Sequence, residues 1–181
     1  MDKTIREKLK DIHPSNVIID LEPILSYMES TGIEFRDRNL AGPMGIATFY
    51  CVYLDLDKMV RQFNTRMIGY IMLHELGHYK RILKMGKQHV LDMLSNHDFD
   101  IFSDHVIGEE IAADRYASYV YLKLTKTILS REITQQLHLE HNRTRYRERT
   151  KQIFGIIEND EEKYIQLLEG FIITQTKEKE I

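Results

Sequence analysis

The pattern of apolar and polar residues changes near residue 65, and the part before it mixes helix and strand signals. A helix is expected over 20–32, since Asp20 is a suitable N-cap and Pro23 suits a first helical turn. Its apolar positions recur at helical spacing: Ile24, Leu25 and Met28. Two extended segments follow at 32–37 and 45–57, the second rich in Ile, Thr, Phe, Tyr and Val. These features predict a small N-terminal sheet.

From Thr65 to the C-terminus the pattern is almost wholly helical. The periodicity predicts helices over about 66–85, 104–126, 131–154 and 161–174. Gly86 ends the first of these, and Ser130 and Asp160 are N-caps for the last two. The plan is an α+β fold. Residues 1–127 form its core, and residues 128–181 form a helical extension packed on that core as one domain.

Composition narrows the class of protein. The chain has 181 residues, 43% of them hydrophobic and 29% charged, as expected of one globular domain. A net charge of −3 argues against direct binding of nucleic acid. No run of about 20 apolar residues could span a membrane, and the charged N-terminus is unlike a signal peptide. Cys51 has no second cysteine to pair with, so we expect a buried thiol and a cytoplasmic protein.

The candidate chemistry begins with His74-Glu75-Leu76-Gly77-His78, an H-E-x-x-H pattern. On a helix, residues four apart lie about 40° apart on one face, so both imidazoles can reach one ion. Glu75 lies beside that face, where it can meet a metal-bound water. The opposite side is apolar and suited to a core: Met72, Leu73, Leu76, Tyr79 and Leu83. The alternative is a surface helix whose histidines face solvent.

A zinc site of this kind needs a third protein ligand. The metzincin spacing is absent, because Arg81 and Lys84 stand where that pattern has Gly and His. Glu110 and Asp114 lie one turn apart on the next predicted helix, so one can bind zinc and the other can orient a ligand histidine. Glu109 has no acid one turn later, so we prefer Glu110. Small residues near the Glu110 face would let the two helices approach closely: Ala113 and Ala117.

These motifs together resemble a known group of proteins. H-E-L-G-H followed by E-x-x-A-D-x-Y-A is similar to the gluzincins, and most similar to the ImmA/IrrE family of metallo-endopeptidases, over residues 32–124. The resemblance implies a zincin-like fold with one Zn²⁺ bound by His74, His78 and Glu110, and with Asp114 supporting a ligand. The family often has Asn where this chain has Asp114, which is closer to the minigluzincins.

The expected activity is hydrolysis of peptide bonds, with Glu75 as general base for a zinc-bound water. Tyr121 and His105 are the two candidates for stabilising the oxyanion. An extended substrate is expected to pair with the strand over 45–57. The resemblance further implies a site-specific intracellular protease whose protein or peptide substrate is a regulator such as a helix-turn-helix repressor. The alternatives are a general minigluzincin peptidase and a catalytically silent, zinc-stabilised interaction module.

Overall fold

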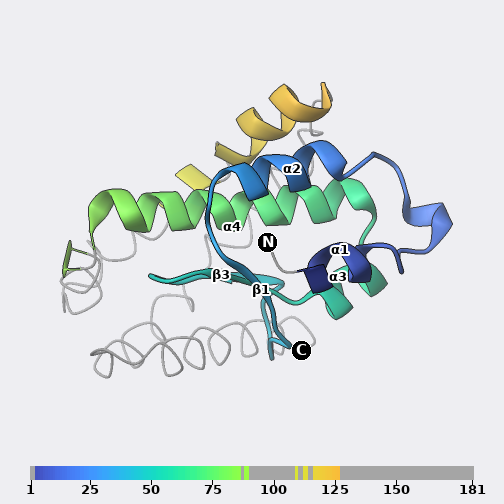
Figure 1. The fold of residues 1–181 in the computed structure, drawn as a ribbon, viewed down its shortest axis with the longest axis horizontal. Helices are drawn as coiled ribbons and strands as arrows, with labels where there is room; N and C mark the ends of the chain where they lie inside the picture. The colour runs from blue at the N-terminus through green and yellow to red at the C-terminus, as the bar shows by residue number, and fades with distance from the viewer. Residues whose placement is uncertain (1–2, 87, 90–108, 110–111, 114–115, 127–181) are drawn as a thin grey trace, which may run out of the picture.

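The computed structural model describes residues 3–86, 88–89, 109, 112–113 and 116–126. Three of the predicted site residues lie outside these ranges: His105, Glu110 and Asp114. The predicted helices over 131–154 and 161–174, with the whole extension over 128–181, also lie outside them. The described part is a mixed α+β structure with a small sheet, as predicted from the sequence (Figure 1).

The described elements follow one another from the N-terminus to the end of the long central helix. They are α1 (Lys3–Leu9), the 3-10 turn η1 (Pro14–Asn16), α2 (Glu22–Ser30), β1 (Phe35–Asp37), β2 (Gly45–Ala47), β3 (Val52–Leu54), α3 (Leu56–Gln62) and α4 (Thr65–Met85). Residues 116–125 are also helical, and Lys126 ends them with a φ of 57°. None of the helices in the described part is long and apolar enough to cross a membrane.

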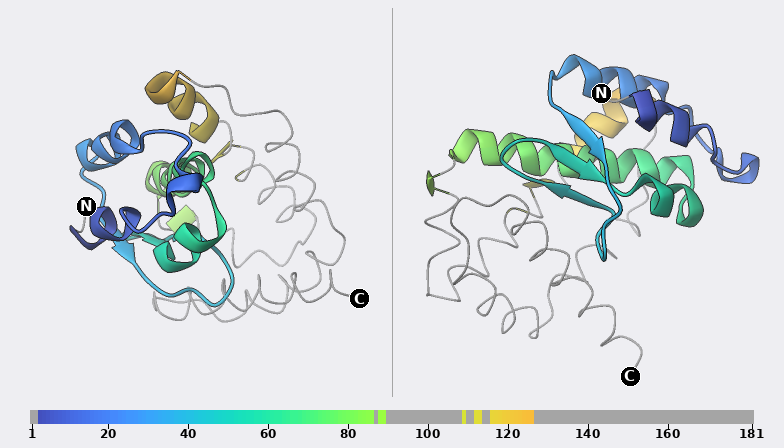
Figure 2. Two further views of the ribbon diagram at one scale, coloured as in Figure 1. Left: turned by 90° about the vertical axis from the view of Figure 1, so that its right-hand side faces the viewer. Right: turned by 60° about the horizontal axis from the view of Figure 1, so that its bottom comes forward.

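The sheet has three strands in the order β1-β3-β2. Strand β1 runs parallel to β3, with Phe35 opposite Val52, and β2 runs antiparallel to β3, with Gly45 opposite Leu54. Strand β2 therefore lies at an edge of this sheet. The sheet lies along α4, as two further views of the ribbon make plain (Figure 2).

The prediction of a single strand over 45–57 is wrong, because this segment forms a hairpin followed by a helix. The Thr48 hydroxyl accepts hydrogen bonds from the backbone N–H groups of Tyr50 and Cys51, each at 3.2 Å. The Thr48 N–H donates to the Cys51 carbonyl at 3.0 Å, which closes the turn. The predicted strand over 32–37 is likewise shorter, since only Phe35–Asp37 pairs.

Helix α4 confirms the predicted helix over 66–85 almost to the residue. Asn64 caps its start, with its side-chain oxygen accepting from the Met67 N–H at 3.1 Å, and Gly86 ends it with a φ of 81°. Four of the predicted core residues are buried: Met72, Leu73, Leu76 and Tyr79. Leu83 is 57% exposed, so its assignment to the core is wrong. It lies one turn beyond Tyr79, the last α4 residue with a buried side chain.

The core lies between α4, the sheet and the N-terminal helices. Ile24, Leu25 and Met28 of α2 are buried there, as their spacing predicted. Cys51 is completely buried in a smaller cluster with Leu40, which confirms the expected buried thiol.

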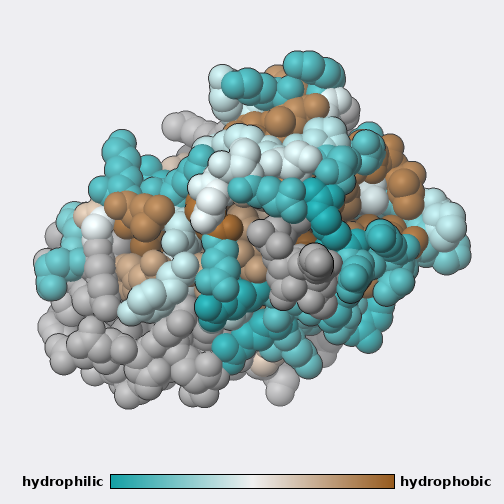
Figure 3. All heavy atoms as spheres, viewed as in Figure 1, coloured by the Kyte–Doolittle hydropathy of each residue, from teal (hydrophilic) through white to brown (hydrophobic). Residues whose placement is uncertain are grey.

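Outside the core, the face drawn in Figure 3 is largely hydrophilic, with separate hydrophobic areas. Scattered apolar exposure of this kind is normal for a globular protein.

Asp55 joins the end of β3 to α3 and is 2% exposed. Its carboxylate accepts hydrogen bonds from the backbone N–H groups of Leu40 at 2.9 Å and Lys58 at 3.0 Å, and the Lys58 ammonium lies 3.1 Å away. Burial opposes ionisation of Asp55, but these hydrogen bonds and the lysine outweigh it and lower its pKa. The ionised carboxylate therefore stabilises the fold.

Asp55→Ala is expected to lower the free energy of unfolding by about 2–4 kcal/mol at pH 7, because a helix cap is lost and buried donors lose their acceptor. The folded pKa lies below the unfolded value of about 3.9, so this stabilisation is fully present above that value and is lost as the pH falls through the folded pKa. Urea unfolding at pH 7 and pH 3 measures both effects. Asp57→Ala, a change at a more exposed acid, is the control. Equal losses for Asp55→Ala and Asp57→Ala would contradict this role.

Candidate metal centre

The two histidines of the H-E-x-x-H pattern meet on one face of α4. Their Nε2 atoms lie 3.0 Å apart, and the ring centroids are 4.6 Å apart with the ring planes at 82°. Two nitrogen ligands at about 2.0–2.1 Å from a tetrahedral zinc ion are separated by about 3.3 Å, so a small rotation of either ring suits the pair to zinc. Without a metal, the same atoms are at hydrogen-bonding distance.

Both rings remain partly accessible to solvent, as does the Glu75 side chain between them in sequence. The ring of Tyr70, itself buried, lies one turn before His74 with its centroid 6.1 Å from the imidazole centroid. Tyr70 was not among the residues predicted from sequence, although its i, i+4 spacing from His74 indicates the contact. The buried ring of Tyr70 thus lies next to side chains that solvent reaches.

Glu75 lies against the backbone of β2 at Gly45. A Cβ atom built on Gly45 would lie 2.5 Å from the Glu75 Cγ and 3.2 Å from its Oε1. The Glu75 carboxylate is therefore held beside the edge strand, next to the helix face that carries His74 and His78. This placement fits a base that is not itself a metal ligand.

The described residues on either side of Glu110 pack closely on α4. A Cβ atom built on Gly77 would lie 3.1 Å from the Ala113 Cα and 3.2 Å from its carbonyl oxygen. Arg81 forms an ion pair with Glu109. A Cβ atom built on Gly69 would lie 3.6 Å from the Tyr121 ring. Residues later in α4 contact residues earlier in the second segment, so α4 and that segment run antiparallel. The predicted close approach through small residues is present, since Ala113 and Ala117 are both completely buried.

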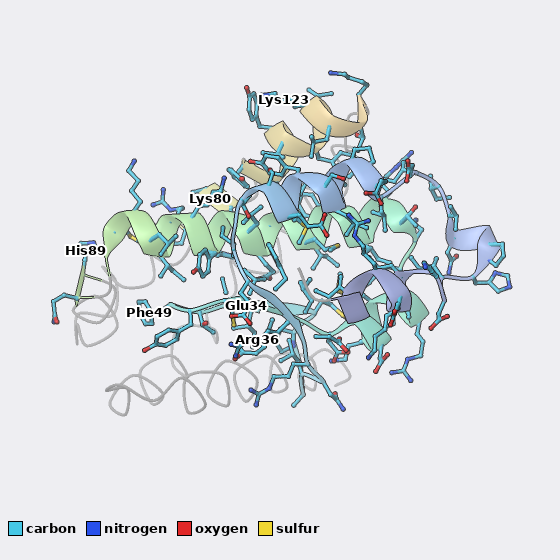
Figure 4. The ribbon with its side chains drawn as sticks, viewed as in Figure 1. Glu34, Arg36, Phe49, Lys80, His89 and Lys123 are labelled. Atoms are coloured by element: carbon cyan, nitrogen blue, oxygen red, sulfur yellow. The ribbon has the colours of Figure 1, made fainter. Side chains whose placement is uncertain are left out.

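A second set of contacts joins this segment to α2. The hydroxyl groups of Tyr27 and Tyr116 lie 2.8 Å apart, and the Lys80 ammonium donates to the Tyr27 hydroxyl at 3.3 Å. The Lys80 nitrogen also lies 5.5 Å and 5.2 Å from the centroids of the Tyr27 and Tyr116 rings. Figure 4 shows Lys80 on the side of α4 turned away from the sheet. This network fixes α2, α4 and residues 116–125 relative to one another.

Glu109, the rival to Glu110, is engaged elsewhere. Both of its carboxylate oxygens accept hydrogen bonds from the Arg81 guanidinium, through Nε and Nη2. Hydrogen bonding to Glu109 raises the pKa of Arg81, despite the opposing effect of burial. Because Arg81 binds both oxygens of this carboxylate, Glu109 could bind a metal ion only after this ion pair was broken. The arrangement therefore favours Glu110 over Glu109 as third ligand.

The structure does not bring Tyr121 to the histidines. Its side chain is completely buried and packs at Gly69, which lies five residues before His74 and about 140° around the helix. Burial raises the pKa of the Tyr121 hydroxyl. Of the two predicted oxyanion donors, Tyr121 is thus placed in the core, and His105 lies outside the described residues.

Within the described ranges, no three His, Cys, Asp or Glu side chains gather closely enough to hold a metal ion. His74 and His78 lie together on α4, and Glu110 lies outside these ranges. No protein-family model, curated protein or solved structure matches the chain.

Proposed function

We propose that this protein is a zinc-dependent endopeptidase in which His74, His78 and Glu110 bind one zinc ion. The observation that carries the proposal is the 3.0 Å separation of the two Nε2 atoms on one partly exposed face of α4. Glu75, on the adjacent face and against β2, adds the group that peptide hydrolysis requires. The close packing of Gly77 on Ala113 supports a ligand from the segment that contains Glu110.

When bound, zinc would polarise the scissile carbonyl and lower the pKa of a water molecule to about 7. Glu75 accepts the proton of the attacking water and delivers it to the leaving amine. Asp114, assigned from the sequence alone, would accept the free N–H of a ligand histidine and thereby select its tautomer. Each of these roles uses a side chain whose type and spacing suit it.

The substrate is proposed to be a polypeptide in an extended conformation. Strand β2 lies at an edge of the sheet, and its Gly45 backbone lies beside Glu75. A peptide that paired with this edge would pass next to the base. The hairpin leaves three residues of β2 for such pairing, fewer than the single strand over 45–57 implied.

The likeness to the ImmA/IrrE family supports a narrower role, which is site-specific cleavage of an intracellular regulator such as a helix-turn-helix repressor in the cytoplasm. A general minigluzincin peptidase would have the same site without a dedicated partner. Incubation with a proteome-derived peptide library separates the two, since a site-specific enzyme cuts few sequences and a general one cuts many.

The test of the proposal is a cleavage assay on the full-length protein with casein and the same peptide library, read by mass spectrometry. Cleavage is expected with added zinc, is expected to stop with a chelator, and is expected to return when zinc is restored. A protein that binds zinc tightly but cuts none of these substrates would instead favour the silent interaction module.

A further inference from the structure

Gly45 is the point at which β2 approaches the proposed base most closely. A Cβ atom built there would lie 2.5 Å from the Glu75 Cγ, 3.0 Å from its Cδ and 3.2 Å from its Oε1. Real Cβ atoms essentially never come within 3.0 Å of a neighbour. All three nearest atoms belong to Glu75, so the space that any other residue would fill at position 45 is taken by this one side chain.

The backbone conformation does not explain a glycine at this position. The glycines with positive φ in the described part are Gly32 and Gly86, and Gly45 is not among them. Gly45 is the first residue of β2, and a glycine in a strand weakens it because glycine loses more conformational freedom on folding than any other residue. Gly45 also pairs opposite Leu54 in a regular antiparallel register. The remaining physical reason for glycine here is space for Glu75.

Moving the Glu75 side chain away from Gly45 would cost conformational energy. The closest atom, Cγ, is the second carbon of the side chain, so moving it requires a change of χ1 rather than a turn of the carboxylate. On a helix one of the three χ1 rotamers is blocked by the preceding turn, which leaves few alternatives. A side chain at position 45 would therefore either strain Glu75 or move its carboxylate away from β2.

We propose that Gly45 is a positioning residue: its lack of a side chain allows the Glu75 carboxylate to lie between α4 and the edge strand. The packing part of this inference stands without any catalytic role for Glu75. Its consequence for turnover rests on the proposed function. The two parts are tested by different measurements, so failure of one is distinguishable from failure of the other.

The packing part is tested by thermal unfolding of the full-length protein, with and without a chelator. Gly45→Ala is expected to lower the Tm by on the order of 2–10 °C in the parent and in the Glu75→Gln background, which keeps Cγ. In the Glu75→Ala background, which lacks Cγ, the loss is expected to disappear. Gly69→Ala is the matched control. It crowds Ile24 at 2.6 Å on another face of α4, so its Tm loss should not depend on residue 75.

Equal Tm changes for Gly45→Ala in all three backgrounds would overturn the inference, because the crowding would then involve something other than Glu75. If Gly45→Ala alone does not fold, recovery of folding in the double variant with Glu75→Ala supports the inference. Failure of that double variant to fold overturns it.

The consequence for turnover is tested with the zinc-loaded protein. Gly45→Ala is expected to lower kcat at least tenfold with little change in KM or zinc content, since a misplaced base affects the proton transfer rather than binding. In the Glu75→Gln background the same substitution is expected to have no further effect on kcat. An additive loss of kcat would show that Gly45 acts independently of the base and would overturn its positioning role.

Discussion

Glu75→Gln is expected to reduce peptide hydrolysis by about 10²–10⁴-fold while the protein keeps its zinc. Glutamine preserves the shape of the side chain beside Gly45, so the fold of α4 and β2 should not change. It cannot accept the proton of the attacking water, which is the step assigned to Glu75. Initial rates on a peptide identified as a substrate, together with zinc content by elemental analysis, measure the two effects separately.

The control for this substitution is Glu34→Gln, the same chemical change at an acid next to β1. Glu34 pairs with Arg36, and its side chain is exposed. Its loss should leave both the rate and the zinc content unchanged. Undiminished cleavage by Glu75→Gln would remove this residue from the mechanism, whereas loss of zinc from that variant would make Glu75 a ligand rather than a base.

The second large effect concerns the choice among three acids. Glu110→Ala is expected to remove most of the zinc affinity, because it deletes a direct ligand. Asp114→Ala is expected to weaken zinc binding about 10–100-fold, as losses of a group that orients a ligand usually do. Glu109→Ala should change zinc affinity little, because its carboxylate is bound to Arg81. Competition with a chromophoric chelator gives all three affinities.

Glu109→Ala is also the internal control for folding in this series. It deletes the ion pair with Arg81, which joins α4 to the segment that follows. A modest fall in Tm with unchanged zinc affinity is the expected result. If zinc affinity is lost with Glu109→Ala and kept with Glu110→Ala, the assignment of the third ligand is wrong.

The central helix and its two histidines follow from sequence because the determinants are local. An apolar stripe at helical spacing and Gly86 at the end define α4 within one residue. Once α4 is a helix, the i, i+4 spacing of His74 and His78 brings their Nε2 atoms together. The close packing on Ala113 was also foreseeable, because small residues at one-turn spacing mark a tight helix contact.

The hairpin between β2 and β3 was not foreseeable from the same patterns. The turn over 48–51 contains no Gly, Pro, Asn or Asp, and its neighbours are residues that favour strands. The turn is closed instead by the Thr48 hydroxyl, a weak sequence signal. Asp55 is a clearer signal that was missed, since an N-cap there ends the extended segment and begins α3.

The contact between Gly45 and Glu75 lies beyond sequence reasoning for a different reason. The two residues are 30 positions apart, and they meet because the hairpin folds β2 onto α4. The pattern of residues 32–57 does not fix that fold, since a single strand over 45–57 fits it equally well. A lone glycine at the start of the predicted strand is the only local sign of a close approach.

The zinc content of the purified protein is the direct test of the proposed metal centre. Elemental analysis and native mass spectrometry are expected to find one zinc ion per chain, released by a chelator and absent from His74→Ala and His78→Ala. A parent protein that takes up no zinc after incubation with the metal would contradict the account. So would an undiminished zinc content in both histidine variants.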